Sequence, residues 1–153
     1  MTAELTALVF AIFVQGLAIA AAGARMNREL GPRYNTGPRD SQPEMSPTLG
    51  RLRRAVANGF EGLAMFAPAA LIVAVSGQST TTTAIAAWTY VAARLFYIPA
   101  YALGLSPWRS AIWAVGFFAT LTLLVVGLDL TLSSVHKYPA ECGARSPRRA
   151  ART

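Results

Sequence analysis

Apolar residues along the chain fall into four long runs separated by polar segments. The runs cover residues 3–24, 52–75, 82–103 and 108–130, to within a few positions. As helices that rise about 1.5 Å per residue, all four are long enough to cross the roughly 30 Å hydrocarbon core of a membrane. The second and third connections are short, which brings consecutive helices together in opposite directions. The pattern therefore predicts an all-α integral membrane protein, an antiparallel bundle of four transmembrane helices with both termini on one side.

The remaining segments are polar and carry most of the charge. Residues 25–51 are expected to form a polar loop, and residues 136–153 a basic, disordered tail outside a membrane domain of residues 1–135. Seven arginines lie between Arg25 and Arg54, which favours a cytoplasmic loop by the positive-inside rule. The basic tail favours the opposite orientation. The loop is given more weight because it lies between two spans.

A cleaved signal peptide is the alternative interpretation of the first run, because small residues occupy positions 20–24. Signal peptides begin with basic residues and have a shorter apolar core. This run begins with Glu4, has no Lys or Arg at its start, and is longer than such a core. We therefore expect it to be a retained membrane span.

Composition supports the membrane assignment and argues against other classes of protein. Hydrophobic residues make up 54% of the chain and charged residues 14%, against about a quarter charged in soluble domains. The net charge of +7 could indicate nucleic-acid binding. However, the aromatic residues lie inside the apolar runs, so we expect the arginines to meet lipid headgroups instead. The chain has one cysteine, Cys142, and one histidine, His136, so the sequence predicts no metal site.

The second run carries a polar stripe, Arg54, Asn58 and Glu61, whose spacing of four and three places it on one helix face. An ionisable residue at the centre of a span costs about 2.5–3.5 kcal/mol unless it faces a partner or a cavity. Glu61 lies about 10 Å into the membrane and Arg94 of the third run about 14 Å from the same side. We therefore predict that Glu61 and Arg94 pair, directly or through a ligand.

The third run has its own stripe: Tyr90, Arg94, Tyr97 and Tyr101. Tyr90 is expected to pack in the core, whereas Tyr97 and Tyr101 lie towards the loop side and can offer hydroxyls to a polar ligand. The alternative is a purely aromatic packing face. Gln15, in the middle of the first run, is expected to form a hydrogen bond between helices.

Polar residues of three runs thus gather in one leaflet. They are Arg54, Asn58, Glu61, Arg94, Tyr97, Tyr101 and Arg109. Arginines bind carboxylates, a glutamate binds an ammonium group, and amide and phenol groups bind peptide amides. Such a set suits a zwitterionic ligand with several carboxylates. Asp129 lies about 30 Å farther along the fourth helix than Arg109, at the opposite interface, and is expected to be solvated.

Three motifs in this order resemble those of the MAPEG family, the membrane-associated proteins of eicosanoid and glutathione metabolism. They are RAVANGFE at 54–61, ARLFYIPAY at 93–101 and the Arg109–Ser110 pair that begins the fourth helix. The sequences GPRD at 37–40 and GRLRRA at 50–55 are similar to those of the bacterial branch. The resemblance covers about residues 5–130, which include all four runs.

The resemblance implies a homotrimer in a bacterial inner membrane, with glutathione bound between subunits on the cytoplasmic side. Its implied function is a glutathione-dependent, or other thiol-dependent, transferase or peroxidase that acts on lipophilic electrophiles or hydroperoxides. By position, Arg54, Asn58 and Glu61 would hold glutathione.

The resemblance assigns roles to five further residues. Arg94, Tyr97 and Tyr101 would line the same site. Arg109 and Ser110 would lower the pKa of the thiol, because a cation and a hydroxyl donor stabilise the attacking thiolate.

Three positions depart from the family pattern. Val56 and Ala57 stand where glutathione-using members often carry histidine and another cation, and Trp113 stands where a tyrosine is often found. Two alternatives therefore stay open. One is a non-catalytic structural or lipid-binding protein whose polar stripes stabilise the oligomer, and the other is a small transporter.

Overall fold

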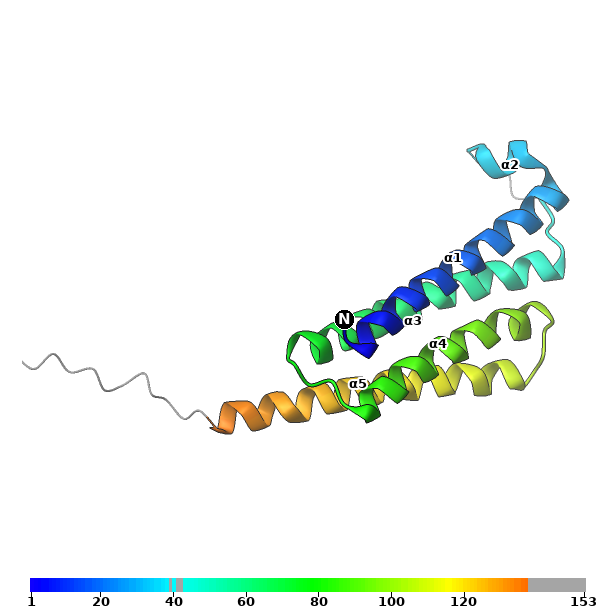
Figure 1. Ribbon diagram of the computed structural model, residues 1–153. Helices are drawn as coiled ribbons and strands as arrows, with labels where there is room; N and C mark the ends of the chain where they lie inside the picture. Colours follow the sequence, from blue (N-terminus) through cyan, green and yellow to red (C-terminus); the bar gives the residue numbers. More distant parts are fainter. Residues whose placement is uncertain (39, 41–42, 138–153) are drawn as a thin grey trace, which may run out of the picture.

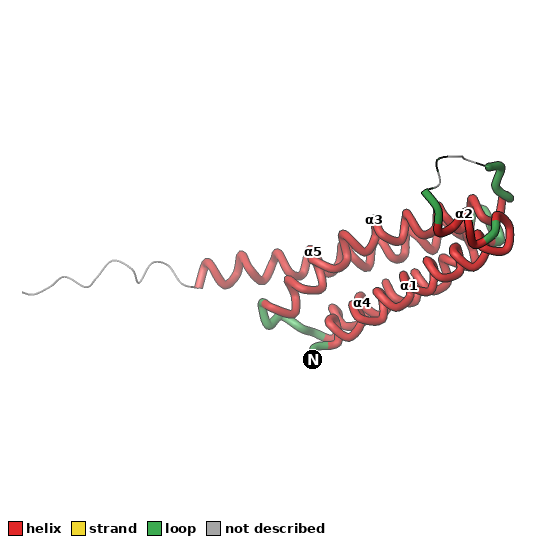
Figure 2. The backbone as a smooth tube through the Cα atoms, turned by 90° about the horizontal axis from the view of Figure 1, so that it is seen from above, coloured by secondary structure: helices red, strands yellow, loops and turns green. Residues whose placement is uncertain are grey.

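The computed structural model describes residues 1–38, 40 and 43–137, with side chains as far as residue 128. This part of the chain is helical and has no strand. The helices are α1 (Ala3–Leu30), α2 (Pro32–Thr36), α3 (Pro47–Val75), α4 (Thr81–Ala102) and α5 (Trp108–Lys137). The four long helices lie side by side and alternate in direction (Figure 1, Figure 2). The N-terminus, the α3–α4 turn and the far end of α5 lie at one end of the bundle, and α2 lies at the other.

The core of the bundle is built largely from small and aromatic side chains. Helix α1 packs against α3 and α4, and α5 packs against the same two helices. Fully buried alanines from three helices allow the backbones to approach closely, namely Ala7, Ala69, Ala70 and Ala87. Between α3 and α4, the rings of Phe66 and Tyr90 stack with centroids 3.9 Å apart and an interplanar angle of 5°. The stacked pair confirms the packing role expected of Tyr90.

Three helices are long and apolar enough to cross a membrane by length and composition: α1, α3 and α5 as far as Leu128. Helix α4 has 22 residues and packs among these three, but it is not in this group. Its threonines, its tyrosines and the buried Arg94 lower its mean hydropathy. Of the four predicted spans, three thus have the length and hydropathy of a membrane span within the described residues.

The segment between the first two spans is more helical than expected. Helix α1 continues to Leu30 and ends at Gly31, whose φ of 82° favours glycine. Helix α3 begins at Pro47, where the Ser46 hydroxyl accepts a hydrogen bond from the backbone N–H of Leu49 at 3.2 Å. The predicted loop of residues 25–51 was therefore too long. The apolar runs did not mark the ends of these helices, because backbone hydrogen bonding continues into polar sequence.

Glu29 ties the two ends of this shortened connection together. Its carboxylate accepts hydrogen bonds from the guanidinium of Arg25 and from the hydroxyl of Ser46, the latter at 2.5 Å. Because Ser46 caps α3 and Glu29 belongs to the last turn of α1, these contacts fix α3 relative to α1.

Both tight turns between the later helices use the same backbone motif. Gly77 (φ 68°) and Gly104 (φ 72°) adopt left-handed conformations. The residues that follow donate to carbonyls five positions earlier, Gln78 N–H to Val73 and Leu105 N–H to Ala100, both at 3.0 Å. The predicted turn at Gly77–Gln78 is confirmed. At the second turn, a Cβ on Gly104 would lie 2.7 Å from Cζ of Arg51, so α3 contacts the entry to α5 here.

Helix α5 extends past the predicted start of the tail at His136 and ends at Lys137. Residues 138–153, including Cys142, lie outside the described residues, as does the side chain of Asp129. The predicted tail and the predicted solvation of Asp129 therefore stay predictions.

Candidate functional site

Helices α3 and α4 meet through polar side chains in the half of the bundle nearest α2. Arg94 is only 8% exposed, and its Nη1 donates a hydrogen bond to Oδ1 of Asn58 at 2.9 Å. The Nδ2 of Asn58 is 3.4 Å from Oε2 of Glu61, the long end of a hydrogen bond. Arg94 and Glu61, predicted to meet, are thus connected through Asn58. No direct salt bridge joins them in the described part of the chain.

Two glycines of α3 make room for this arrangement. A Cβ on Gly62 would lie 1.7 Å from Nη2 of Arg94, and a Cβ on Gly59 would lie 2.0 Å from Oε1 of Gln15. Side chains of α4 and α1 therefore lie directly against the α3 backbone. Gln15 also donates from Nε2 to the Val56 carbonyl at 3.0 Å, which confirms the hydrogen bond predicted between helices.

Aromatic rings surround the guanidinium of Arg94. Its Cζ lies 5.1 Å from the ring centroid of Tyr90 and 5.7 Å from that of Tyr97. Both distances are within the range of a cation–π interaction. The Nε of Arg94 is buried and has no hydrogen-bond partner among the described residues. The rings and Asn58 therefore provide the described stabilisation of this buried charge.

Tyr97 connects this group to the start of α5. Its ring centroid lies 5.3 Å from that of Tyr101. The guanidinium of Arg109 lies 5.0 Å from the centroid of Tyr101. A continuous path of contacts therefore runs across three helices. Its members are Glu61, Asn58, Arg94, Tyr97, Tyr101 and Arg109.

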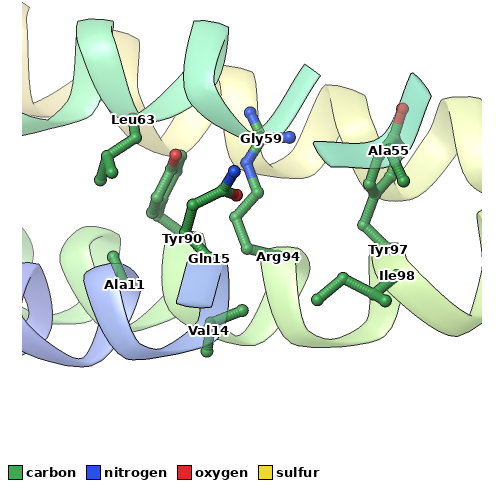
Figure 3. A pocket seen from close by; sticks show the side chains of 10 residues that line it. All are labelled: Ala11, Val14, Gln15, Ala55, Gly59, Leu63, Tyr90, Arg94, Tyr97 and Ile98. Carbon is green, nitrogen blue, oxygen red and sulfur yellow. The ribbon is translucent and has the colours of Figure 1, made fainter. Parts of the chain in front are cut away.

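The interior beside Arg94 holds only a small cavity, of about 10 Å³. Figure 3 shows its lining from three helices, with Gln15, Tyr90, Arg94 and Tyr97 as the polar members. This is about the room that one water molecule needs, whereas organic ligands occupy pockets of roughly 300–1,000 Å³. A ligand as large as a tripeptide would therefore have to contact this site from the outer face of the bundle.

The outer face above the path is open. Glu61 and Arg54 are exposed, and Tyr101 and Arg109 are partly exposed. Apolar neighbours of Glu61 on α3 are exposed as well, Phe60 at 52% and Met65 at 43%. The carboxylate of Glu61 therefore connects the surface to the buried Arg94 through hydrogen bonds.

The structure connects six of the eight predicted site residues. Arg54 and Ser110 are exposed and make no hydrogen bond or ring contact with the path in the described part of the chain. Arg94 and Tyr97 are buried, so within a single chain they act on the site through Asn58 and Tyr101, which they contact. Trp113, at one departure from the family pattern, stacks on Phe117 with centroids 5.1 Å apart.

A second buried charge lies at the opposite end of the bundle and was not predicted as a site. Glu4 is fully buried and accepts hydrogen bonds from the hydroxyl of Thr83 at 2.5 Å and of Ser79 at 2.8 Å. Thr83 also forms a capping box with Thr80 at the start of α4. A carboxylate at the start of an apolar run was the available signal for this contact.

The sequence was also compared with known proteins. No curated protein and no solved structure matched the chain. A model of the MAPEG family matches residues 1–128, which include α1 to α4 and the described side chains of α5. The match covers the Asn58–Glu61 stripe, the Arg94–Tyr101 stripe and the Arg109–Ser110 pair. The chain is therefore an integral membrane protein of the MAPEG family.

Proposed function

We propose that this protein is a thiol-dependent membrane transferase or peroxidase that uses glutathione or a related thiol. In this proposal it acts as a homotrimer in a bacterial inner membrane, with the thiol bound between subunits on the cytoplasmic side. The observation that carries the proposal is that the buried Arg94 is connected through Asn58 to the exposed carboxylate of Glu61. Membership of the MAPEG family supports it, because that family includes glutathione transferases and peroxidases.

A lone chain would leave this site facing lipid. Glu61 lies about 10 Å from the end of the apolar run, and a charge at depth is costly by about 2.5–3.5 kcal/mol near the centre. The exposed Phe60 and Met65 beside it indicate that this face meets an apolar environment. A second copy of the chain, with a charged ligand held between the copies, satisfies both kinds of side chain. In this assembly all four long helices, α4 included, cross the membrane.

The described contacts suggest how the residues divide the work. Glu61 is placed to accept from the ammonium group of the thiol, and Arg54 to bind a carboxylate. Asn58 already accepts from Arg94 and donates one N–H to Glu61, which leaves its second N–H for a peptide carbonyl. Arg94 and Tyr97 then act as positioning residues, through Asn58 and Tyr101.

The chemistry needs a thiolate near the start of α5. Arg109, held over the Tyr101 ring at 5.0 Å, and the Ser110 hydroxyl would stabilise it, and the thiol proton leaves to solvent. With an electrophile, the sulfur forms a bond to carbon and the leaving group departs with the bonding electrons. With a hydroperoxide, the sulfur attacks the terminal oxygen, the O–O bond breaks to give a sulfenic acid, and the alkoxide takes a proton from solvent and leaves as the alcohol. A second thiol then yields disulfide and water.

Purified oligomer in detergent tests the proposal through the ultraviolet absorbance of the thiolate and conjugation of an aromatic halide. We expect a saturable signal with glutathione, and a loss of about 100-fold in conjugation rate for Arg109→Ala, the scale seen when a charge-stabilising donor is removed. Arg28→Ala is the matched control, because Arg28 is exposed on α1 away from the site. Absence of a thiolate signal with glutathione and with other cellular thiols would contradict the proposal.

The second candidate is a non-catalytic membrane protein whose polar network locks the oligomer. It is favoured by Ala57, an exposed residue where a family cation is expected. This alternative predicts that Arg94→Ala dissociates the oligomer. If the oligomer of that variant stays intact while stabilisation by glutathione or its S-hexyl derivative disappears from thermal unfolding, the alternative is wrong.

A further inference from the structure

A separate pocket of about 230 Å³ lies between α1, α2 and α3, at the arginine-rich end of the bundle. It is lined by apolar and polar side chains, chiefly Ile19, Gly23, Met26, Asn35, Arg53 and Val56. Helix α2 folds back beside the end of α1 at this point (Figure 1). We propose that this pocket binds the headgroup of an anionic phospholipid.

The lining has the two-sided character of a lipid site. Ile19, Met26 and Val56 supply an apolar wall from the membrane-facing parts of α1 and α3, and Asn35 and Arg53 supply polar groups. A Cβ on Gly23 would meet nothing within 4 Å, so this glycine leaves open space. The apolar wall suits the first carbons of an acyl chain, which a free phosphate ion does not have.

Arg53 supplies the charge that a phosphate needs. It is exposed, and its one described hydrogen bond is from Nη1 to the sulfur of Met45 at 3.1 Å. Arg25, in contrast, is neutralised by Glu29. No carboxylate pairs with Arg53 in the described part of the chain, and a guanidinium can donate two parallel hydrogen bonds to a phosphate.

The pocket lies where a headgroup would be. The segment from Arg25 to Arg54 contains seven arginines and three acidic residues, and the pocket joins this polar segment to the ends of two apolar helices. Basic pockets between helices at the cytoplasmic surface attract anionic headgroups, by about 1 kcal/mol for each arginine. Arg53 and Val56 are not members of the proposed thiol site, so this inference does not depend on that function.

Native mass spectrometry of the intact oligomer in detergent can measure the binding. Phosphatidylglycerol and phosphatidylcholine with identical acyl chains are compared, and glycerol phosphate serves as the soluble anion. We expect phosphatidylglycerol to bind at least about fivefold more tightly than phosphatidylcholine, the equivalent of about 1 kcal/mol. Glycerol phosphate at the same concentration should leave the lipid-bound fraction unchanged.

Two variants locate the site. Arg53→Gln should weaken the binding of phosphatidylglycerol about fivefold and that of phosphatidylcholine, whose ammonium group offsets the phosphate charge, by less. Arg28→Gln removes the same charge from an exposed position at the same end of the bundle. This variant should weaken the binding of either lipid by less than twofold. Gly23→Leu fills the open space and should weaken the binding of both lipids while the number of subunits in the oligomer stays the same.

Four results would overturn the inference. One is equal binding of the two lipids, and another is an equal loss in Arg28→Gln and Arg53→Gln. The third is a change of oligomeric state in Gly23→Leu with lipid binding retained, which would assign the pocket to a neighbouring copy. Displacement of lipid by glycerol phosphate would assign it to a soluble anion.

Discussion

Two buried ionisable side chains, Arg94 and Glu4, lie at different ends of the same bundle and are held in different ways. Arg94 donates to Asn58, which in turn donates to the exposed Glu61, so its contacts lead outward to the surface. Both carboxylate oxygens of Glu4 accept from hydroxyls of the α3–α4 turn and the start of α4. The described side-chain contacts of Glu4 are therefore with neutral hydroxyls at the α3–α4 turn and the start of α4, and none leads to another charged group.

The comparison teaches that a buried charge does not by itself mark a binding site. The two groups are almost equally buried, at 8% and 0% exposure. What separates them is whether their hydrogen bonds lead to an exposed charge: those of Arg94 lead to the carboxylate of Glu61, whereas those of Glu4 end at the hydroxyls of Thr83 and of the exposed Ser79. Variants near Arg94 should therefore change binding, while variants at Glu4 should change stability alone.

The largest effect is expected at Gly62. In Gly62→Ala the new Cβ would lie 1.7 Å from Nη2 of Arg94 and must displace the guanidinium from Asn58. A lost hydrogen bond to a charged group costs about 1.5–3 kcal/mol, more than the roughly 1 kcal/mol that alanine gains over glycine in a helix. Thermal unfolding in detergent should show lower stability, and thiol binding should be lost. Gly16→Ala is the control, because a Cβ there meets nothing within 4 Å.

Glu4→Ala should destabilise the protein by about 2 kcal/mol, because it removes a buried carboxylate together with the hydrogen bonds it accepts from Thr83 and Ser79. The thiolate signal per folded protein should stay the same. Glu44→Ala, at an exposed position, should leave the unfolding temperature unchanged. Loss of the thiolate signal in Glu4→Ala with an intact oligomer would end the distinction between the two charges.

Glu61→Gln should change thiol binding and leave the stability of the protein nearly unchanged, the reverse of Glu4→Ala. Removal of the charge should weaken thiol binding about tenfold, equivalent to about 1.4 kcal/mol, since a charge-assisted hydrogen bond becomes a neutral one. Glu61 is exposed, so unfolding without ligand should change by less than about 0.5 kcal/mol. Titration calorimetry and thermal unfolding of one preparation measure both values. Unchanged affinity would remove Glu61 from the proposed site.

The smallest effect is expected for Gln15→Leu. It removes the hydrogen bond to the Val56 carbonyl, which joins α1 to α3. Hydrogen bonds between membrane helices average about 0.6 kcal/mol, and a loss of this size should appear in the unfolding temperature. Thiol affinity should fall less than in Glu61→Gln, because Gln15 does not contact the path that leads to Glu61.

The sequence alone supported a prediction of the main elements and of the layer where polar residues gather. Apolar runs located the four long helices, and helix geometry placed Glu61 and Arg94 at similar depths. Mean hydropathy identified α4 least clearly as a membrane span, because several of its polar residues are buried against neighbouring helices. The length of the first loop was also missed, since helices α1 and α3 continue into polar sequence.

Contacts that depend on particular neighbours could not be predicted in this way. Spacing along one helix did not show that Asn58 lies between Arg94 and Glu61, nor that Gly59 and Gly62 accept side chains from α1 and α4. Arg51 appeared as one arginine among seven, although its side chain lies against Gly104. Such contacts follow from the rotation of each helix about its own axis, which hydropathy leaves undetermined.

The long last helix has a practical consequence for laboratory work. Helix α5 continues to Lys137 and leaves the bundle at the end opposite α2 (Figure 1). An affinity tag or fluorophore joined directly after Lys137 would therefore start far from Arg109 and from the arginine-rich end. Oligomer captured on a sensor chip through such a tag would keep its arginine-rich face turned towards the flowing solution.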